Sequence, residues 1–145
     1  MDTVEDILRD KGYVVHFIGP RATVLQAVEL MCSRRVGALL VADTKATLGI
    51  ISERDVLTRV ILERRDPADT RVDQVMTHAV ACVRPNTNTR EAMAVMTERR
   101  CRHLPVVTDG AVIGMVSIGD LVRWVSREQE IEIRMLTEYV HGGYS

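Results

Sequence analysis

The chain has 145 residues, of which 19 are basic and 20 acidic, so its formal net charge is −1. This balance offers no basic surface to a nucleic-acid polymer, and 3% aromatic residues leave few rings to stack on bases. No apolar run approaches the roughly 18–20 residues of a membrane span, and no signal-peptide pattern is present. The three cysteines form no Cys-x-x-Cys pair. We therefore expect a cytoplasmic globular protein that contacts neither membrane nor nucleic acid.

The first half of the chain predicts alternating helices and strands. An entry helix over 3–9 precedes an extended segment at 13–18, which Pro20 keeps out of a helix. Thr23 is a typical N-cap for an amphipathic helix. The remaining predicted elements are the helix 24–35, the strands 38–42 and 47–51, and a helix over 53–63.

The second half predicts the same order after a charged connector at 64–72. Its elements are a strand at 80–83, a helix at 89–100 capped by Asn88, strands at 103–107 and 111–116, and a helix at 118–126. Beyond it, Ile131, Met135, Leu136 and Tyr139 recur at helical spacing. This stripe predicts a separate amphipathic helix over 128–140 that docks on the body or on a partner.

The two halves are copies of one unit. Gly-Ile-Ile-Ser-Glu-Arg-Asp at 49–55 returns as Gly-Met-Val-Ser-Ile-Gly-Asp at 114–120, 65 residues later (120 − 55). This offset holds without a gap over 46 aligned pairs, from Val15 and Val80 to Val60 and Val125, and 13 of the pairs are identical. We expect an α/β (α+β) fold of two β-α-β-β-α repeats related by a pseudo-two-fold, with equivalent clefts between them. The predicted domains are repeat 1 over 1–66, repeat 2 over 72–126, and a C-terminal helix and tail over 127–145.

These motifs resemble a known family. Arg-His-Leu-Pro-Val at 102–106 and a Gly-x-x-Ser-x-x-Asp ending in each copy are similar to the tandem cystathionine-β-synthase (CBS) domain pair, the Bateman module. The resemblance covers about residues 4–126 and looks like a stand-alone, bacterial-type pair. It implies a sensor of adenosine nucleotides, usually AMP, ADP or ATP and sometimes NAD(H). It also implies a homodimer.

The Ser-x-x-Asp segments at Ser52/Asp55 and Ser117/Asp120 have two interpretations. One is helix capping, with Ser at the N-cap and a carboxylate three residues later. The other is ligand binding, since a helix N-terminus attracts phosphate and a carboxylate can accept both hydroxyls of a ribose. The resemblance implies that the aspartates bind ribose and that the serines bind phosphate or sugar. Capping and binding are compatible, so both interpretations stay open.

The two copies differ around this motif, and the basic and apolar neighbours also have two interpretations. Arg54 either supplies charge to a phosphate or is an exposed helix arginine, and its counterpart is Gly119. Arg102 and His103 either reach phosphates, as the resemblance implies, or form a surface pair, and the first copy has Gly37-Ala38 there. This asymmetry predicts that the Asp120 cleft binds anions better than the Asp55 cleft. Apolar residues that either hold an adenine or belong to the core are Val15, Ile18, Val83, Leu39 and Leu104.

The leading hypothesis is a non-catalytic regulatory or energy-sensing dimer that binds an adenine nucleotide, AMP first, and signals to an unidentified protein partner. The alternatives are an NAD(H)-binding sensor and a ligand-free structural or interaction dimer. An enzyme is disfavoured because the sequence shows no activated nucleophile or acid–base pair. A metal is not expected either, since the four histidines, His16, His78, His103 and His141, lack ligand spacing.

Overall fold

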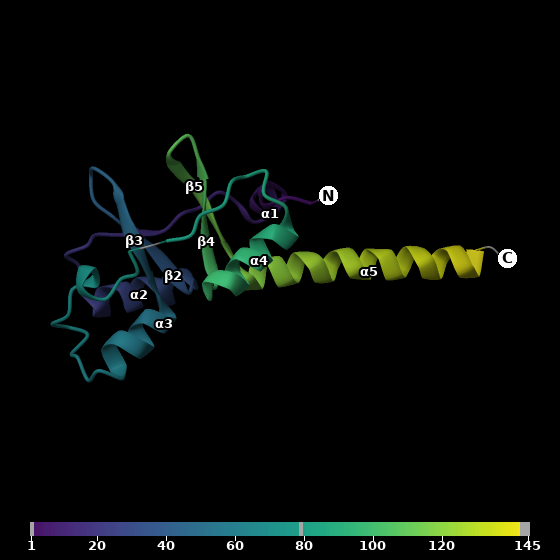
Figure 1. Ribbon diagram of the computed structural model, residues 1–145. Coiled ribbons are helices and arrows are strands. Elements are labelled where there is room, and N and C mark those ends of the chain that lie inside the picture. The colour runs from purple at the N-terminus through teal and green to yellow at the C-terminus, as the bar shows by residue number, and fades with distance from the viewer. Residues whose placement is uncertain (1, 79, 143–145) are drawn as a thin grey trace. The chain divides into compact units, whose positions relative to one another are not determined.

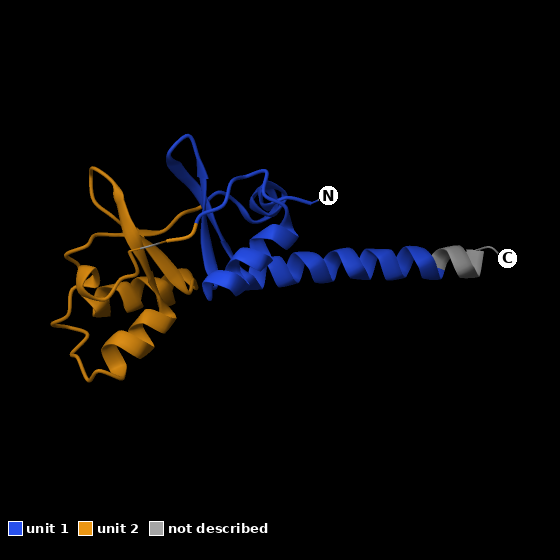
Figure 2. Ribbon diagram, viewed as in Figure 1, with its two compact units in different colours: residues 1–13, 82–145 blue, residues 14–81 orange. Residues whose placement is uncertain are grey.

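The computed structural model describes residues 2–78 and 80–142, with side chains described up to residue 137 (Figure 1). The chain divides into two compact units, shown in Figure 2. Unit 2 is Val14–Ala81, and unit 1 combines Met1–Tyr13 with Cys82–Ser145. Within the described ranges, no helix combines the length and apolar character needed to cross a bilayer.

Unit 2 is built on a three-stranded sheet. Its strands are β1 (Phe17–Ile18), β2 (Ala38–Ala42) and β3 (Thr47–Ser52), in the order β1-β2-β3. β1 runs parallel to β2, and β3 runs antiparallel to it, with Leu39 opposite Ile51. Its helices are α2 (Val24–Arg34), α3 (Glu53–Val56), the π-helix η1 (Leu57–Ile61) and the 3₁₀ turn η2 (Val72–Gln74).

Local sequence explains the ends of α2. The Thr23 hydroxyl accepts from the Gln26 amide, and the Gln26 side chain accepts from the Thr23 amide, which completes a capping box. Arg35 ends the helix with a left-handed backbone. The apolar face of α2 then joins the sheet in one core, whose fully or nearly buried members are Val24, Ala27, Met31, Leu39, Val41, Ile51, Val60, Val72, Val75 and Met76.

Unit 1 packs three helices with a two-stranded hairpin. The helices are α1 (Val4–Lys11), α4 (Thr89–Arg99) and α5 (Ile118–Gly142), and the strands are β4 (His103–Thr108) and β5 (Ala111–Ser117). The hairpin is antiparallel, with Leu104 opposite Val116. Both α1 and α5 contact β5 and each other, while α4 contacts β4 and α5. The side chains of Val4, Leu8, Leu104, Val106, Val116 and Leu121 are fully buried.

The start of the N-terminal helix α1 in unit 1 makes the same backbone hydrogen bonds as the turn η2 in unit 2. The Val4 and Glu5 amides donate to Thr87 and Pro85 carbonyls, 2.8 and 3.0 Å away. In the same way, the Val72 and Asp73 amides donate to Ala22 and Pro20 carbonyls, 2.8 and 3.0 Å away. Pro85 and Thr87 are the repeat partners of Pro20 and Ala22, so each repeat is completed by a short segment that lies outside the 46 pairs aligned at offset 65.

The predicted division at residue 66 therefore differs from the compact units. Met1–Tyr13 lie with the second repeat, not with the first. The pairing of Val4 with Val72 has an offset of 68 residues (72 − 4), so the gap-free alignment does not reveal it. The repeat boundaries 1–66, 72–126 and 127–145 remain predictions, because a sequence repeat and a compact unit are different divisions of a chain.

Several predicted elements have other bounds in the structure. A strand is expected at 80–83, but these described residues form only one isolated bridge, between Val83 and Val106. The extended segment at 13–18 forms a strand only at Phe17–Ile18. The helix predicted at 53–63 is α3 followed by the π-helix η1. The two helices predicted at 118–126 and 128–140 are one continuous helix, α5, since no Gly or Pro interrupts residues 120–140.

Candidate functional site

Each unit carries one capping box at the end of a strand. In unit 2, the Asp55 carboxylate oxygen Oδ2 accepts from the Ser52 amide at 2.9 Å and from its hydroxyl at 3.1 Å. In unit 1, Asp120 Oδ2 accepts from the Ser117 amide at 2.9 Å. The Asp120 amide in turn donates to the Ser117 hydroxyl at 3.1 Å. The structure thus brings each predicted Ser–Asp pair together, and capping is the role that it shows.

The Asp55 carboxylate is buried in unit 2, with only 7% of the residue exposed. Its second oxygen, Oδ1, accepts from the Thr77 hydroxyl at 3.1 Å. The Arg59 Nε lies 3.8 Å from the same oxygen, while Arg59 donates to the Val75 and Met76 carbonyls. The carboxylate therefore faces a neutral hydroxyl at hydrogen-bond distance and a cation slightly further away.

The Asp120 carboxylate in unit 1 is held by two cations. The Lys11 ammonium at the end of α1 donates to Oδ2 at 2.7 Å, and Arg123 donates to Oδ1 at 2.9 Å. Burial raises the pKa of Asp120, but the Lys11 hydrogen bond, the Ser117 amide and the Lys11 charge outweigh burial. The pKa of Asp120 consequently lies below its usual value, and the group is a carboxylate at neutral pH.

The predicted basic residues lie near these boxes in the chain, and their side chains face solvent to different degrees. Arg54 is exposed on the first turn of α3. Arg102 is exposed, and its carbonyl accepts from the Ile118 amide at 2.8 Å, which places its backbone beside the start of α5. His103 opens β4 and is half-buried.

The apolar candidates divide by burial. Leu39 and Leu104 are fully buried, which favours the core interpretation for both. Val83 is also largely buried, and its amide donates to the Pro105 carbonyl at 3.0 Å. Val15 and Ile18 are half-buried and so retain surface that a ligand can contact.

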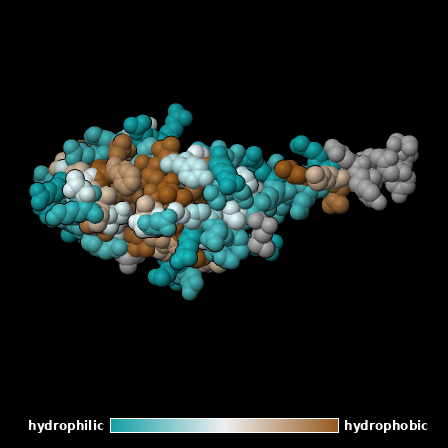
Figure 3. Space-filling model, turned by 90° about the horizontal axis from the view of Figure 1, so that it is seen from above, coloured by the Kyte–Doolittle hydropathy of each residue, from teal (hydrophilic) through white to brown (hydrophobic). Residues whose placement is uncertain are grey.

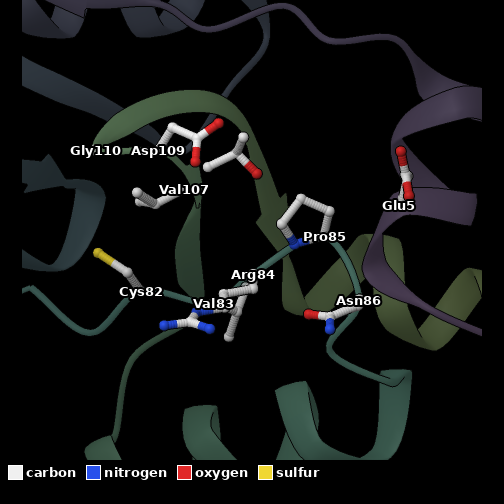
Figure 4. Close-up of a pocket in the computed structure, with 10 residues that line it drawn as sticks. Glu5, Cys82, Val83, Arg84, Pro85, Asn86, Val107, Asp109 and Gly110 are labelled. Atoms are coloured by element: carbon white, nitrogen blue, oxygen red, sulfur yellow. The ribbon is translucent and has the colours of Figure 1, made fainter.

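Unit 1 also contains an open pocket of about 800 Å³ at the turn of the β4–β5 hairpin (Figure 4). Its lining residues are Glu5, Cys82, Val83, Arg84, Pro85, Asn86, Val107, Thr108, Asp109 and Gly110. Ser117 and Asp120 belong to the opposite end of the hairpin, where His103 pairs with Ser117. Of the predicted site residues, this pocket includes only Val83, so it is separate from the capping box.

The structure adds polar partners that the sequence patterns did not identify. They are Thr77 and Arg59 on Asp55, and Lys11 and Arg123 on Asp120. Arg59 and Arg123 lie four and three residues after their aspartates, a helical spacing that the sequence does contain. Thr77 and Lys11 come from the segments that complete each repeat, outside the alignment at offset 65.

Among the described residues, no group of three or more His, Cys, Asp or Glu side chains is placed to hold a metal ion. Burial raises the pKa of the Cys82 and Cys101 thiols, so both are protonated at neutral pH.

The chain is similar to known proteins. The sequence pattern of the CBS domain matches residues 4–62 and 72–127. The CBS domain-containing protein CBSX3, mitochondrial, of Arabidopsis thaliana is 39% identical over 151 residues, which cover 98% of this chain and 73% of that protein. Another relative from the same plant, CBSCBSPB2, is 40% identical over 102 residues, and the match spans 19% of its length.

Solved structures agree with the fold. A putative signal-transduction protein with CBS domains from Burkholderia ambifaria MC40-6 has a TM-score of 0.84 and 43% identity, covering 88% of this chain and 96% of that chain. The CBS domain pair of protein MJ0100, solved with 5′-methylthioadenosine and S-adenosyl-L-methionine, has a TM-score of 0.78 at 18% identity. It covers 88% of this chain and 98% of that one, and at this identity it is evidence for the fold alone. The sequence match over both repeats and the relatives at 39–43% identity show that this chain belongs to the CBS domain family and carries a pair of CBS domains.

Proposed function

We propose that this CBS pair is a non-catalytic regulatory module that binds an adenine nucleotide, with AMP as the first candidate. The observation that carries the proposal is the pair of largely buried carboxylates, Asp55 and Asp120, each at a helix start in its own repeat. Their side chains are 9% and 10% exposed. A carboxylate has about four lone-pair positions, so it can keep its capping bonds and still accept from a ribose hydroxyl.

The proposed ribose contact agrees with the chemistry of the Asp120 box. Asp120 is a carboxylate at neutral pH, and a charged acceptor binds hydroxyl donors more strongly than a neutral one. The ligands of protein MJ0100, 5′-methylthioadenosine and S-adenosyl-L-methionine, are adenosine derivatives, so the fold accommodates this class elsewhere. ADP, ATP and NAD(H) share the adenosine moiety and remain in the proposal as alternatives to AMP.

Other predicted site residues have secondary roles in this proposal. Arg102 and His103 in unit 1 and Arg54 in unit 2 supply positive or donor groups for phosphate, together with Ser52 and Ser117. Val15, Ile18 and Val83 supply apolar surface for the adenine. We propose no metal and no catalytic residue.

A thermal-shift panel with AMP, ADP, ATP, NADH and S-adenosyl-L-methionine tests the ligand class. A ligand at 100 times its dissociation constant stabilises the folded state by about 2.7 kcal/mol, which is a shift of several degrees. A shift with at least one of the adenosine compounds and none with guanosine or cytidine monophosphate supports the proposal. No shift with any compound would contradict it.

Calorimetry on two variants then tests the ribose role. Asp120→Ala removes the carboxylate from unit 1, and we expect affinity there to fall about 10–100-fold, the loss of one or two charged hydrogen bonds. Asp55→Ala should do the same at the unit 2 site. Asp69→Ala, in an exposed loop, is the matched control and should leave binding unchanged. Unchanged binding in both site variants, with melting temperatures recorded beside it, would leave the motif as a cap alone.

A ligand-free interaction dimer is the second candidate, and a specific surface favours it. Between α2 and α3, unit 2 has an apolar groove of about 500 Å³ lined by Val28, Met31, Cys32, Arg35, Val36, Gly37, Glu53, Val56 and Leu57. Leu57 of this lining, and Ile61 and Leu62 at the end of η1, are more than half exposed. A dimer in solution together with an empty panel of nucleotides would favour this candidate.

A further inference from the structure

Lys11 in unit 1 contacts the same pair of repeat-equivalent residues as Thr77 in unit 2, a strand carbonyl and the capping aspartate, although it bonds the other carboxylate oxygen. The Lys11 ammonium donates to the Met115 carbonyl at 2.8 Å and to Asp120 Oδ2 at 2.7 Å. The Thr77 amide donates to the Ile50 carbonyl at 2.8 Å, and its hydroxyl donates to Asp55 Oδ1 at 3.1 Å. Ile50 and Met115 are repeat partners, as are Asp55 and Asp120. A single charged group therefore replaces two neutral donors.

This replacement changes the charge around the carboxylate. Asp120 is contacted by two cations, Lys11 and Arg123, whereas one cation lies within 4 Å of Asp55. Counting the carboxylate and the described cations within ion-pair distance, the net charge is +1 at Asp120 and zero at Asp55. Near a partly buried carboxylate such a difference is weakly screened by water, so it acts on any ligand that carries charge.

A ribose that brings both of its hydroxyls to Asp120 must displace a donor, because the Ser117 amide, Lys11 and Arg123 already use three of about four lone-pair positions. At Oδ2, beside the capping amide, that donor is Lys11. A neutral nucleoside that takes this acceptor leaves the ammonium without an anion, in a side chain that is only 36% exposed. A nucleotide that takes the same acceptor brings its own phosphate, with a charge of about −1.5 to −2 at neutral pH, which the displaced ammonium can approach. At Asp55 the displaced group is the neutral Thr77 hydroxyl, and no such difference arises.

We propose that Lys11 is a specificity-determining residue of the Asp120 site, selecting anionic adenine nucleotides against neutral adenosine. The inference rests on the proposed ribose role of Asp120. It assigns different ligand classes to the two units: nucleotides to the Asp120 site, and nucleosides and nucleotides with less discrimination to the Asp55 site. The selectivity derives from a residue of the N-terminal helix, which the Gly-x-x-Ser-x-x-Asp motif does not include.

The test measures the ratio of AMP affinity to adenosine affinity by calorimetry at pH 7 and fixed salt. Asp55→Ala removes the proposed ribose-binding carboxylate of unit 2, so that binding at the Asp120 site is measured alone. This variant is the parent protein into which the Lys11 substitutions are introduced. In this parent, Lys11→Met is expected to lower the AMP-to-adenosine ratio about tenfold, because AMP no longer meets the ammonium and adenosine no longer competes with it. Lys11→Arg keeps the charge and should keep the ratio high.

The second lysine of the chain provides the matched control. Lys45 lies exposed in the β2–β3 turn, so Lys45→Met changes the net charge equally and should leave the ratio unaltered. Should Lys11→Met fail to fold, Lys11→Gln keeps a donor for the Met115 carbonyl and carries the same expectation. A ratio in Lys11→Met and Lys11→Gln within twofold of the parent would overturn the inference while leaving the proposed function intact. Absence of binding by both compounds in the parent and in the unmodified chain would overturn the proposed function, and this inference with it.

Discussion

At the scale of single residues, the same four-residue motif is used in two electrostatic settings. Ser52–Asp55 and Ser117–Asp120 have the same capping bonds within a few tenths of an ångström. The two boxes differ in the further donors to the carboxylate, which include the Thr77 hydroxyl on Asp55 and the Lys11 ammonium on Asp120. The Ser-x-x-Asp motif therefore sets the position of each carboxylate. The residues that contact the carboxylate set the local charge around a ligand bound there.

The ion pair of Asp120 makes a pH-dependent contribution to stability. Asp120→Asn keeps the shape of the side chain and removes its charge, so we expect a loss of roughly 0.5–1 kcal/mol at pH 7, a modest value because Lys11 is partly exposed. A carboxyl with a lowered folded pKa stabilises the fold above the unfolded value of about 3.9 and loses this effect on protonation. The difference in unfolding free energy between the unmodified chain and Asp120→Asn should therefore shrink as the pH falls below about 4. Urea unfolding at several pH values measures it, and a difference that stays constant from pH 7 to pH 3 would contradict the expectation.

The repeat-equivalent glycines, Gly49 and Gly114, pack against different neighbours. A Cβ on Gly49 would collide with the Thr77 carbonyl oxygen, whose backbone is fixed by its pairing with Ile50. A Cβ on Gly114 would lie 2.8 Å from Leu8 Cδ2, which is the flexible end of a side chain. We expect Gly49→Ala to destabilise by about 3 kcal/mol and Gly114→Ala by about 1 kcal/mol.

Urea unfolding of the glycine variants measures this ranking. Gly19→Ala is the control, since no atom beyond the neighbouring residues of the chain lies within 4 Å of the position that a Cβ would take. A Gly114→Ala protein less stable than Gly49→Ala would show that Leu8 cannot move and that the α1–β5 contact is rigid.

At the scale of elements, α5 has two parts with different surroundings. Its first part is tied to the N-terminal segment, because Trp124 Nε1 donates to Asp2 at 2.8 Å and Arg127 donates to Asp10 at 2.9 Å. Its second part extends past α1 and α4 (Figure 1) and carries apolar side chains on its surface (Figure 3). Ile131, Ile133, Met135 and Leu136 are 53–65% exposed, and the side chain of Tyr139 lies outside the described residues.

Truncation after Arg127 should leave the fold of unit 1 in place. The variant retains Leu121, Trp124 and Arg127, which make the contacts with the body, and loses mainly exposed surface. We expect cooperative unfolding, followed by Trp124 fluorescence, together with a weaker helical signal in circular dichroism and altered association or solubility. Loss of cooperative unfolding would show that the distal part of α5 belongs to the folding unit.

Sequence periodicity predicts most elements because burial repeats regularly in them. The helices at 24–35 and 89–100 and both hairpins agree with the structure to within a residue or two. Periodicity fails where a tertiary contact decides the outcome: Val83 forms a single bridge, and α5 continues through Ser126–Arg127. Both serine–aspartate pairs could be predicted from spacing alone. Lys11 could not, because its approach to Asp120 depends on the folding of a segment that is 109 residues away in the chain.

At the scale of the whole molecule, apolar surface remains on the helical face of unit 2. The groove between α2 and α3 is mostly apolar in its lining, which includes Leu57 at 59% exposure, and Ile61 at the end of η1 is 53% exposed. A few such residues on a monomer are ordinary, but a continuous apolar patch typically marks an interface. A second copy of the chain presents the same patch, so a two-fold pairing covers both at once.

We therefore predict a homodimer at micromolar concentration. Leu57→Asp and Ile61→Asp place a charge in the patch, and each should weaken dimerisation at least tenfold, because an interface buries a charge only at high cost. Sedimentation velocity over a concentration series measures the dissociation constant, and Thr44→Asp in the exposed β2–β3 turn is the control for added charge. A monomer at all concentrations in the unmodified chain would contradict the prediction. A dimer that tolerates both substitutions, but not the truncation after Arg127, would move the interface from the helical face of unit 2 to the exposed stripe of α5.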